Sequence, residues 1–128
     1  MSMFKLEELR VYGLAERLAD LVWDAVLRWD TFAKETVGSQ LVRAADSVGA
    51  NIAEGFGRAS AGDNQRFVRI ARGSLYETRH FLRRAQRRAL LDEDSQKSLH
   101  TVLDELLPLL NAYLASLKPR EKVGSTGG

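Results

Sequence analysis

Arginine residues at helical spacing form the strongest candidate for chemistry in this sequence. One row of six residues repeats at intervals of three or four: Arg69, Arg72, Tyr76, Arg79, Arg83 and Arg87. On an α-helix this spacing places them within about 80° of one another, in a row about 27 Å long. Arginine binds phosphate through paired N–H groups and tyrosine can stack on an unpaired base. The row therefore predicts a site for RNA or another polyanion.

Two other interpretations of this row stay open. It can be the solvated face of a helix, or it can pair with acidic residues of another subunit, because like charges one turn apart repel unless something neutralises them. Residues 58–88 hold nine arginines against Asp63 and Glu77, a net charge of +7, whereas the whole chain carries only +2. Such an uneven charge distribution indicates either an anionic ligand such as nucleic acid or pairing with the protein's own acidic surface.

A second row combines polar residues of several kinds. Its members are Gln40, Arg43, Ser47, Asn51, Glu54 and Arg58. Serine and asparagine are poor residues for a helix interior, so their presence in register indicates a hydrogen-bonded seam between helices or subunits. The alternative is an ordinary polar face in which Glu54 and Arg58 form an ion pair one turn apart.

A third row mixes apolar and acidic side chains near the N-terminus. It comprises Leu9, Tyr12, Glu16, Asp20, Trp23 and Leu27, with Asp24 beside it. A second face of this kind on a helix is typical of an interface. We therefore expect contacts between copies of the chain, for example a ring in which this acidic row meets a basic row of the next subunit.

Catalysis finds little support in the sequence. The chain has no cysteine and two histidines, His80 and His100, which leaves few routes to a nucleophile with a base. Glu77 and His80 match one Glu-x-x-His motif of di-metal bundles, but the second motif that such sites need is missing. We expect no catalytic residue, no metal and no cofactor, hence a protein that is not an enzyme.

The elements that position these rows are helical. Apolar residues at helical spacing predict four helices at about 5–29, 37–56, 61–89 and 93–118, with Ser60 and Asp92 as caps of the last two. Short connections make neighbouring helices antiparallel, so we predict an all-α, up-down-up-down four-helix bundle over residues 1–118 and a flexible tail over 119–128. The expected inner positions of the third helix are Phe67, Ile70, Ala71, Ser74, Leu75, Thr78, Phe81, Leu82 and Ala85.

Composition places the chain among ordinary globular proteins. Hydrophobic residues make up 45% and charged residues 28%. No apolar run reaches the roughly 18 residues of a membrane span, and the first residues lack the pattern of a signal peptide. We therefore expect a cytoplasmic location and no membrane partner.

The segment from Gln40 to Glu77 closely resembles the four-helix bundle proteins called 23S rRNA-intervening-sequence proteins. The resemblance rests on residues 40–58, then on Phe67, Ile70, Ala71 and residues 73–77. It implies a bundle that assembles into a ring, a homopentamer, with no settled biochemical role. The family motif covers most of the second row and adds Ser74 and Glu77 to it. The chain departs from the family with Val48 and Gly49 in place of Ile-Pro, and with more arginine in the third helix.

The family is similar in architecture to the accessory protein of diversity-generating retroelements, a basic pentameric bundle that binds nucleic acid and a reverse transcriptase. That similarity is at the level of fold, and fold alone does not carry function. Two function classes follow from the sequence. The first is a homo-oligomer that binds RNA through the arginine row, and the second is a structural or protein-interaction scaffold, with an unidentified protein partner, whose arginines lie in subunit contacts.

Overall fold

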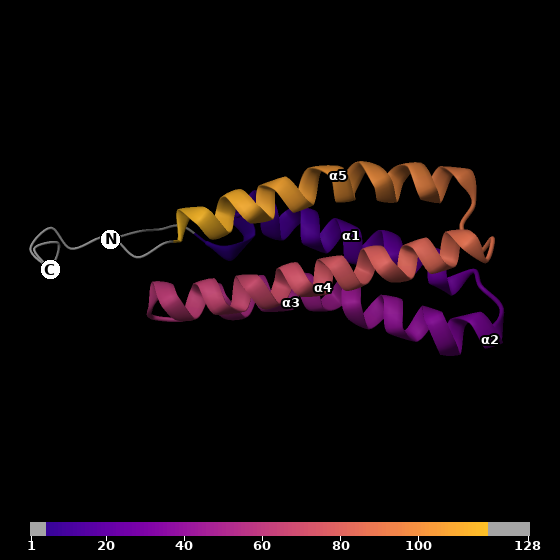
Figure 1. Ribbon diagram of the computed structural model, residues 1–128, viewed down its shortest axis with the longest axis horizontal. Coiled ribbons are helices and arrows are strands. Elements are labelled where there is room, and N and C mark those ends of the chain that lie inside the picture. Colours follow the sequence, from indigo (N-terminus) through magenta and orange to yellow (C-terminus); the bar gives the residue numbers. More distant parts are fainter. Residues whose placement is uncertain (1–4, 118–128) are drawn as a thin grey trace, which may run out of the picture.

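The computed structural model describes residues 5–117, most of which lie in helices (Figure 1). The elements are η1 (Leu6–Glu8), α1 (Arg10–Leu27), α2 (Thr31–Ala33), η2 (Lys34–Gly38), α3 (Ser39–Phe56), α4 (Ala61–Arg87) and α5 (Glu93–Ser116). Element η1 is a single 3-10 turn, and η2 is a π-helical turn that joins α2 to α3 without a break. The predicted tail over residues 119–128 lies outside the described residues.

The four long helices form a four-sided bundle. Helix α1 packs against α3 and α5, and α4 packs against the same two helices. The α1/α3 side of the bundle therefore lies opposite the α4/α5 side. In Figure 1 each long helix runs in the opposite direction to the one before it. The predicted all-α four-helix bundle is confirmed, and no described helix is long and apolar enough to cross a membrane.

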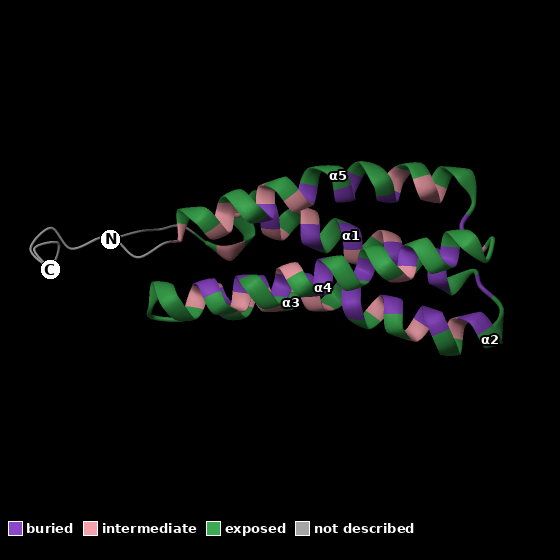
Figure 2. Cartoon of the chain, viewed as in Figure 1, coloured by how far each residue is buried: buried purple, intermediate pink, exposed green. Residues whose placement is uncertain are grey.

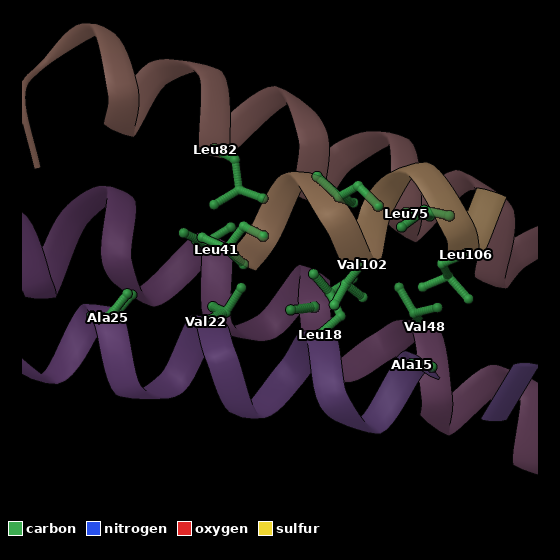
Figure 3. Packing of buried hydrophobic residues seen from close by; sticks show 14 of the residues in the cluster. Ala15, Leu18, Val22, Ala25, Leu41, Val48, Leu75, Leu82, Val102 and Leu106 are labelled. Carbon is green, nitrogen blue, oxygen red and sulfur yellow. The ribbon is translucent and has the colours of Figure 1, made fainter. Parts of the chain in front are cut away.

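The core follows the apolar stripes of all four helices (Figure 2). Figure 3 shows Leu18 and Val22 of α1 lying close to Leu41 of α3 and Val102 of α5. On the second helix, the residues that repeat at helical spacing are all buried: Val37, Leu41, Ala44, Ala45, Val48, Ile52 and Gly55. Ile70 was expected inside but is 44% exposed, because the helical turn directs its neighbours Val68 and Ala71 into the core instead.

The second helix begins earlier than the sequence predicts. We expected residues 30–36 to interrupt the chain and a helix to start at 37, but Asp30 caps a helix that starts at Thr31. The carboxylate of Asp30 accepts a hydrogen bond from the backbone N–H of Ala33 at 2.9 Å. The π-helical turn over Lys34–Gly38 inserts extra backbone. It shifts the phase of the apolar stripe, so the 3.6-residue period breaks although the helix continues.

The first helix is shorter than expected. Instead of a helix from residue 5 to 29, the chain forms η1, passes through Leu9 in an extended conformation, and enters α1 at Arg10. The backbone N–H of Lys5 donates to the carboxylate of Glu8 at 3.2 Å, which closes the short turn as a unit of its own. The helix ends at Leu27, so that the extended Asp30 can cap the next one.

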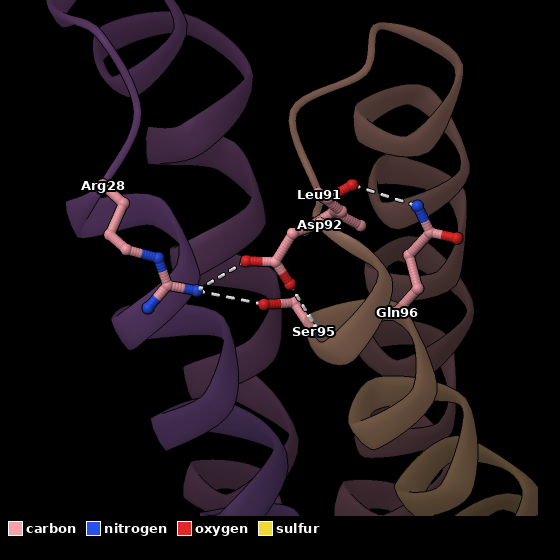
Figure 4. Close-up of polar contacts among 5 residues, drawn as sticks. All are labelled: Arg28, Leu91, Asp92, Ser95 and Gln96. Atoms are coloured by element: carbon pink, nitrogen blue, oxygen red, sulfur yellow. Dashed lines mark hydrogen bonds and ion pairs between the residues drawn. The ribbon is translucent and has the colours of Figure 1, made fainter.

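The starts of the last two helices agree with the sequence. Ser60 Oγ accepts from the N–H of Asp63 at 3.1 Å, and Asp92 Oδ1 accepts from the N–H of Ser95 at 2.7 Å. Arg28, just after α1, donates to Ser95 Oγ at 3.0 Å and lies 3.7 Å from Asp92 (Figure 4). Helix α4 ends at Arg87, two residues before the expected end, because Ala89 adopts a left-handed φ of 59°.

Candidate nucleic-acid interface

The arginine row lies on the flank of α4 that faces α5. Five of its six residues are exposed and Arg72 is half-buried. Arg72 Nη1 donates to Oδ1 of Asn111 on α5 at 3.1 Å. Arg79 and Arg83 border a cavity that α4 shares with α5. The row therefore stands beside the groove between two helices and not on the crest of one.

The positive charge of this row is not neutralised by carboxylates in residues 5–117. The ion pairs of that region join Arg10 to Glu105, Arg28 to Asp92, Arg58 to Glu54 and Arg66 to Asp63, and none includes the row. The guanidinium carbon of Arg79 lies 5.9 Å from the centre of the Tyr76 ring, which is 52% exposed. Five arginines and one accessible aromatic ring thus share a single flank.

The cavity beside Arg79 and Arg83 has a volume of about 120 Å³. Its walls are apolar side chains of both helices and of the loop between them: Leu82, Leu91, Leu99 and Leu103. Its polar border is formed by Arg79, Arg83, Gln86, Gln96, His100 and Asp104. The cavity was not foreseen from the sequence, because nothing there says which flank of the third helix faces the fourth.

The second row divides into three parts: a hydrogen-bonded contact with α4, an ion pair and a set of exposed residues. Ser47 Oγ lies 2.8 Å from Ser74 Oγ, and this hydrogen bond joins α3 to α4. Asn51 Nδ2 donates to both the carbonyl and the hydroxyl of Ser47, at 2.8 and 2.9 Å. Glu54 and Arg58 form the ion pair one turn apart, at 2.6 Å. The remaining members are exposed at the surface: Gln40, Arg43 and Glu77.

The third row follows α1 on the opposite side of the bundle. Leu9 and Tyr12 are half-buried, and the other members are exposed: Glu16, Asp20, Trp23, Asp24 and Leu27. Tyr12, Glu16 and Asp20 line a shallow groove with Asp46, Gly49 and other small residues of α1 and α3. Burial and the neighbouring Glu16 carboxylate raise the pKa of the Tyr12 hydroxyl. Trp23 and Leu27 are each 53% exposed, farther along the same helix.

These placements separate the acidic row from the arginine row. The acidic groove belongs to the α1/α3 side, whereas the arginine row belongs to the α4/α5 side. One copy of the chain therefore does not bring the two rows together. Any pairing between them has to join different copies.

Sequence reasoning missed a groove between the start of the second long helix and the end of α4. Phe32, which is 79% exposed, lines it together with His80, Phe81, Arg84 and Arg88. The rings of His80 and Phe81 meet edge to face, with centroids 5.1 Å apart. The sequence did not reveal this groove, because residues 30–36 were interpreted as an interruption between helices and Phe32 was not assigned to any helix face.

Among the described residues no cluster of histidines and carboxylates could hold a metal ion.

Comparison with known proteins places the fold. The family model described as 23S rRNA-intervening sequence protein matches residues 7–112. The chain is also similar to a solved structure from Bacteroides thetaiotaomicron, described as a protein of unknown function from the S23 ribosomal protein family. The TM-score is 0.71 and the identity 21%, over 81% of this chain and 97% of that one, a likeness that establishes the fold alone. No curated protein matches the chain.

Proposed function

This chain belongs to the 23S rRNA-intervening sequence protein family, and we propose that it is a non-enzymatic, cytoplasmic homo-oligomer that binds RNA or another polyanion through the arginine row. The observation that carries the proposal is that five arginines align on one flank of α4 and none has a carboxylate partner in residues 5–117. Unpaired like charges one turn apart destabilise a helix. A phosphate chain along the row would remove that repulsion.

The chemistry of the row suits nucleic acid better than a small anion. Arginine pairs with phosphate oxygens through two parallel N–H groups, and the row extends over about 27 Å, so that several phosphates can bind at once. Tyr76 lies between Arg72 and Arg79 with its ring exposed, where an unpaired base can stack on it. Trp23 and Leu27 remain available on the other side of the bundle for contacts between copies.

The test is a charge reversal at the middle of the row. Arg79→Glu with Arg83→Glu should weaken the binding of single-stranded RNA at least tenfold, measured by fluorescence anisotropy. The matched control is Arg84→Glu with Arg88→Glu, which makes the same change of charge at the end of α4 and just after it, at residues that line the groove beside Phe32. Light scattering after size exclusion should give the same mass for both variants and the wild type. Equal RNA affinity in all three proteins would reject the proposal.

A second candidate function is supported by the opposite charge of two opposite sides of the bundle. The acidic groove lies on the α1/α3 side and the arginine row on the α4/α5 side. Each copy can therefore present its acidic groove to one neighbouring copy and its arginine row to the other. Head-to-tail contacts of this kind close into a ring, and the pentamer is the ring that the family resemblance implies. The protein would then be a scaffold whose arginines are used up in subunit contacts.

Charge swaps separate the two functions. If the row lies in subunit contacts, Arg79→Glu with Arg83→Glu dissociates the assembly to single chains. Adding Glu16→Arg and Asp20→Arg to the same chain should then restore the mass, because each contact regains opposite charges. If the row binds RNA, the first pair of substitutions leaves the mass unchanged and the second pair restores no RNA affinity.

A further inference from the structure

We propose that the α4/α5 cavity receives one unpaired nucleobase of an RNA strand whose phosphates lie on the arginine row. This inference rests on the proposed RNA-binding function and narrows its ligand to single-stranded RNA. It predicts that the bases of the strand, and not only its phosphates, contribute to affinity. Duplex RNA keeps its bases paired and stacked, so it cannot fill the cavity.

The size and lining of the cavity suit a single planar ring. Its volume is about 120 Å³, and it is open to solvent at one side. A partly open space with apolar walls can admit the planar ring of a base while the sugar and phosphate stay outside. Leu82, Leu99 and Leu103 give the ring an apolar contact surface, and each is at most 9% exposed. A phosphate group would not be stable among them, because a buried anion needs polar partners.

The border of the cavity connects it to the arginine row. Arg79 and Arg83 belong to the row and also line the cavity, so a phosphate bound to them lies at its mouth. One helical turn separates the two residues, and both side chains are exposed. A strand that follows the row therefore carries a base past the opening. The same two arginines would anchor the strand on either side of the inserted base.

The remaining border residues can bind the polar edge of a base. Gln96 Nε2 donates to the backbone carbonyl of Leu91 at 3.0 Å, which fixes the amide and turns its oxygen away from that carbonyl (Figure 4). His100 and Asp104 follow on the same flank of α5, and both are exposed. These groups include acceptors and a donor, which the edge of a base requires. The carboxylate of Asp104 also repels phosphate, so the backbone is kept on the α4 border.

The experiment compares three probes of equal length at one salt concentration. They are a single-stranded RNA, the same strand as a duplex, and an abasic strand that keeps the phosphates and sugars. The proposal expects the single strand to bind the wild-type protein at least tenfold more tightly than the abasic strand. If the abasic strand binds equally well, the cavity takes no base while the proposed RNA-binding function stands. If no probe binds, the proposed function itself fails.

Substitutions distinguish the cavity from stacking on Tyr76. Leu103→Phe fills the cavity and should reduce the difference between the two single strands to less than threefold. The control, Ile70→Phe, adds the same ring at an exposed position on α4 that does not line the cavity. His100→Ala with Asp104→Ala changes only exposed border residues, so it covers the case in which Leu103→Phe fails to fold. An undiminished preference for bases in every one of these variants that folds would overturn the proposal.

Discussion

The hydroxyl oxygens of Ser47 and Ser74 lie 2.8 Å apart and hold α3 against α4 at the middle of the bundle. Ser74 is buried, and Ser47 also accepts a hydrogen bond from Asn51 at 2.9 Å. A partly buried hydrogen bond of this kind favours one register of the two helices, because sliding them would leave the Ser74 hydroxyl without this partner. Ser47 of the second row and Ser74, an expected inner position of the third helix, thus meet in one network.

A double-mutant cycle should measure this contact. Ser47→Ala and Ser74→Ala should each lower the free energy of unfolding by about 1 kcal/mol, since each leaves the other hydroxyl short of a partner. The double variant should lose less than the sum of the two, with a coupling energy of about 0.5 kcal/mol or more. Urea unfolding followed by circular dichroism gives the three differences. Strict additivity would mean that the two hydroxyls do not stabilise each other.

Two glycines should respond in opposite directions to the same substitution. A Cβ at Gly55 would lie 2.6 Å from Asn64 Oδ1 and 3.0 Å from Phe67 Cβ, so Gly55→Ala forces α3 and α4 apart. We expect it to cost about 1–3 kcal/mol. A Cβ at Gly73 would meet nothing within 4 Å, and Gly73→Ala should add about 0.5–1 kcal/mol because alanine loses less entropy in a helix. Thermal unfolding of both variants checks the signs, and equal signs would contradict the close packing at Gly55.

Much of this architecture can be predicted from the sequence, because helix caps and apolar stripes depend on residues that are close together in the chain. Caps such as Ser60 and Asp92 are recognised by residue type, and the apolar stripe of the second helix is regular from Val37 onwards. The start of that helix was not readable, because the π-helical turn over Lys34–Gly38 changes the period without ending the helix.

The candidate sites depend on which helix flank meets which neighbour, and a helical wheel does not contain that information. The position of Arg72 against Asn111 shows that the arginine row faces α5. The cavity bordered by Arg79 and His100 follows from the same placement, as does the groove beside Phe32 on another flank. The sequence could predict the rows but not the spaces between them.

The cap of α5 should make stability depend on pH. Hydrogen bonds from the backbone N–H and the side chain of Ser95, with a smaller contribution from the Arg28 charge, hold the pKa of Asp92 below its ordinary value. A carboxylate with a lowered pKa in the folded state stabilises the fold above its unfolded pKa, and this contribution is lost as pH falls through the folded value. Asp92→Asn retains a capping oxygen but does not titrate.

Comparing the wild-type chain with Asp92→Asn isolates the contribution of the Asp92 charge to stability. The thermal midpoint of the wild-type chain should exceed that of Asp92→Asn at pH 7, and the difference should shrink as the pH is lowered from about 5 into the acid range. Other carboxylates titrate in both proteins, so the difference between the two curves reports Asp92. A difference that stays constant down to acid pH would show that the charge of Asp92 does not contribute to the cap.

The salt dependence of RNA binding tests whether the arginines contact phosphates directly. Each phosphate contact to a single strand contributes about 0.7 to the slope of the logarithm of affinity against the logarithm of salt concentration, so five arginines give at most about 3.5. Replacing Arg79 and Arg83 by alanine should lower the slope by about 1.4 as well as weaken binding. The same replacement at Arg84 and Arg88 should leave the slope within about 0.5 of the wild-type value, since these residues line the groove beside Phe32 and do not line the α4/α5 cavity. Affinities measured from about 50 to 200 mM salt are sufficient to determine these slopes.

If Arg79→Ala with Arg83→Ala weakens binding at an unchanged slope, the two arginines act through the fold or the assembly and the phosphates lie elsewhere.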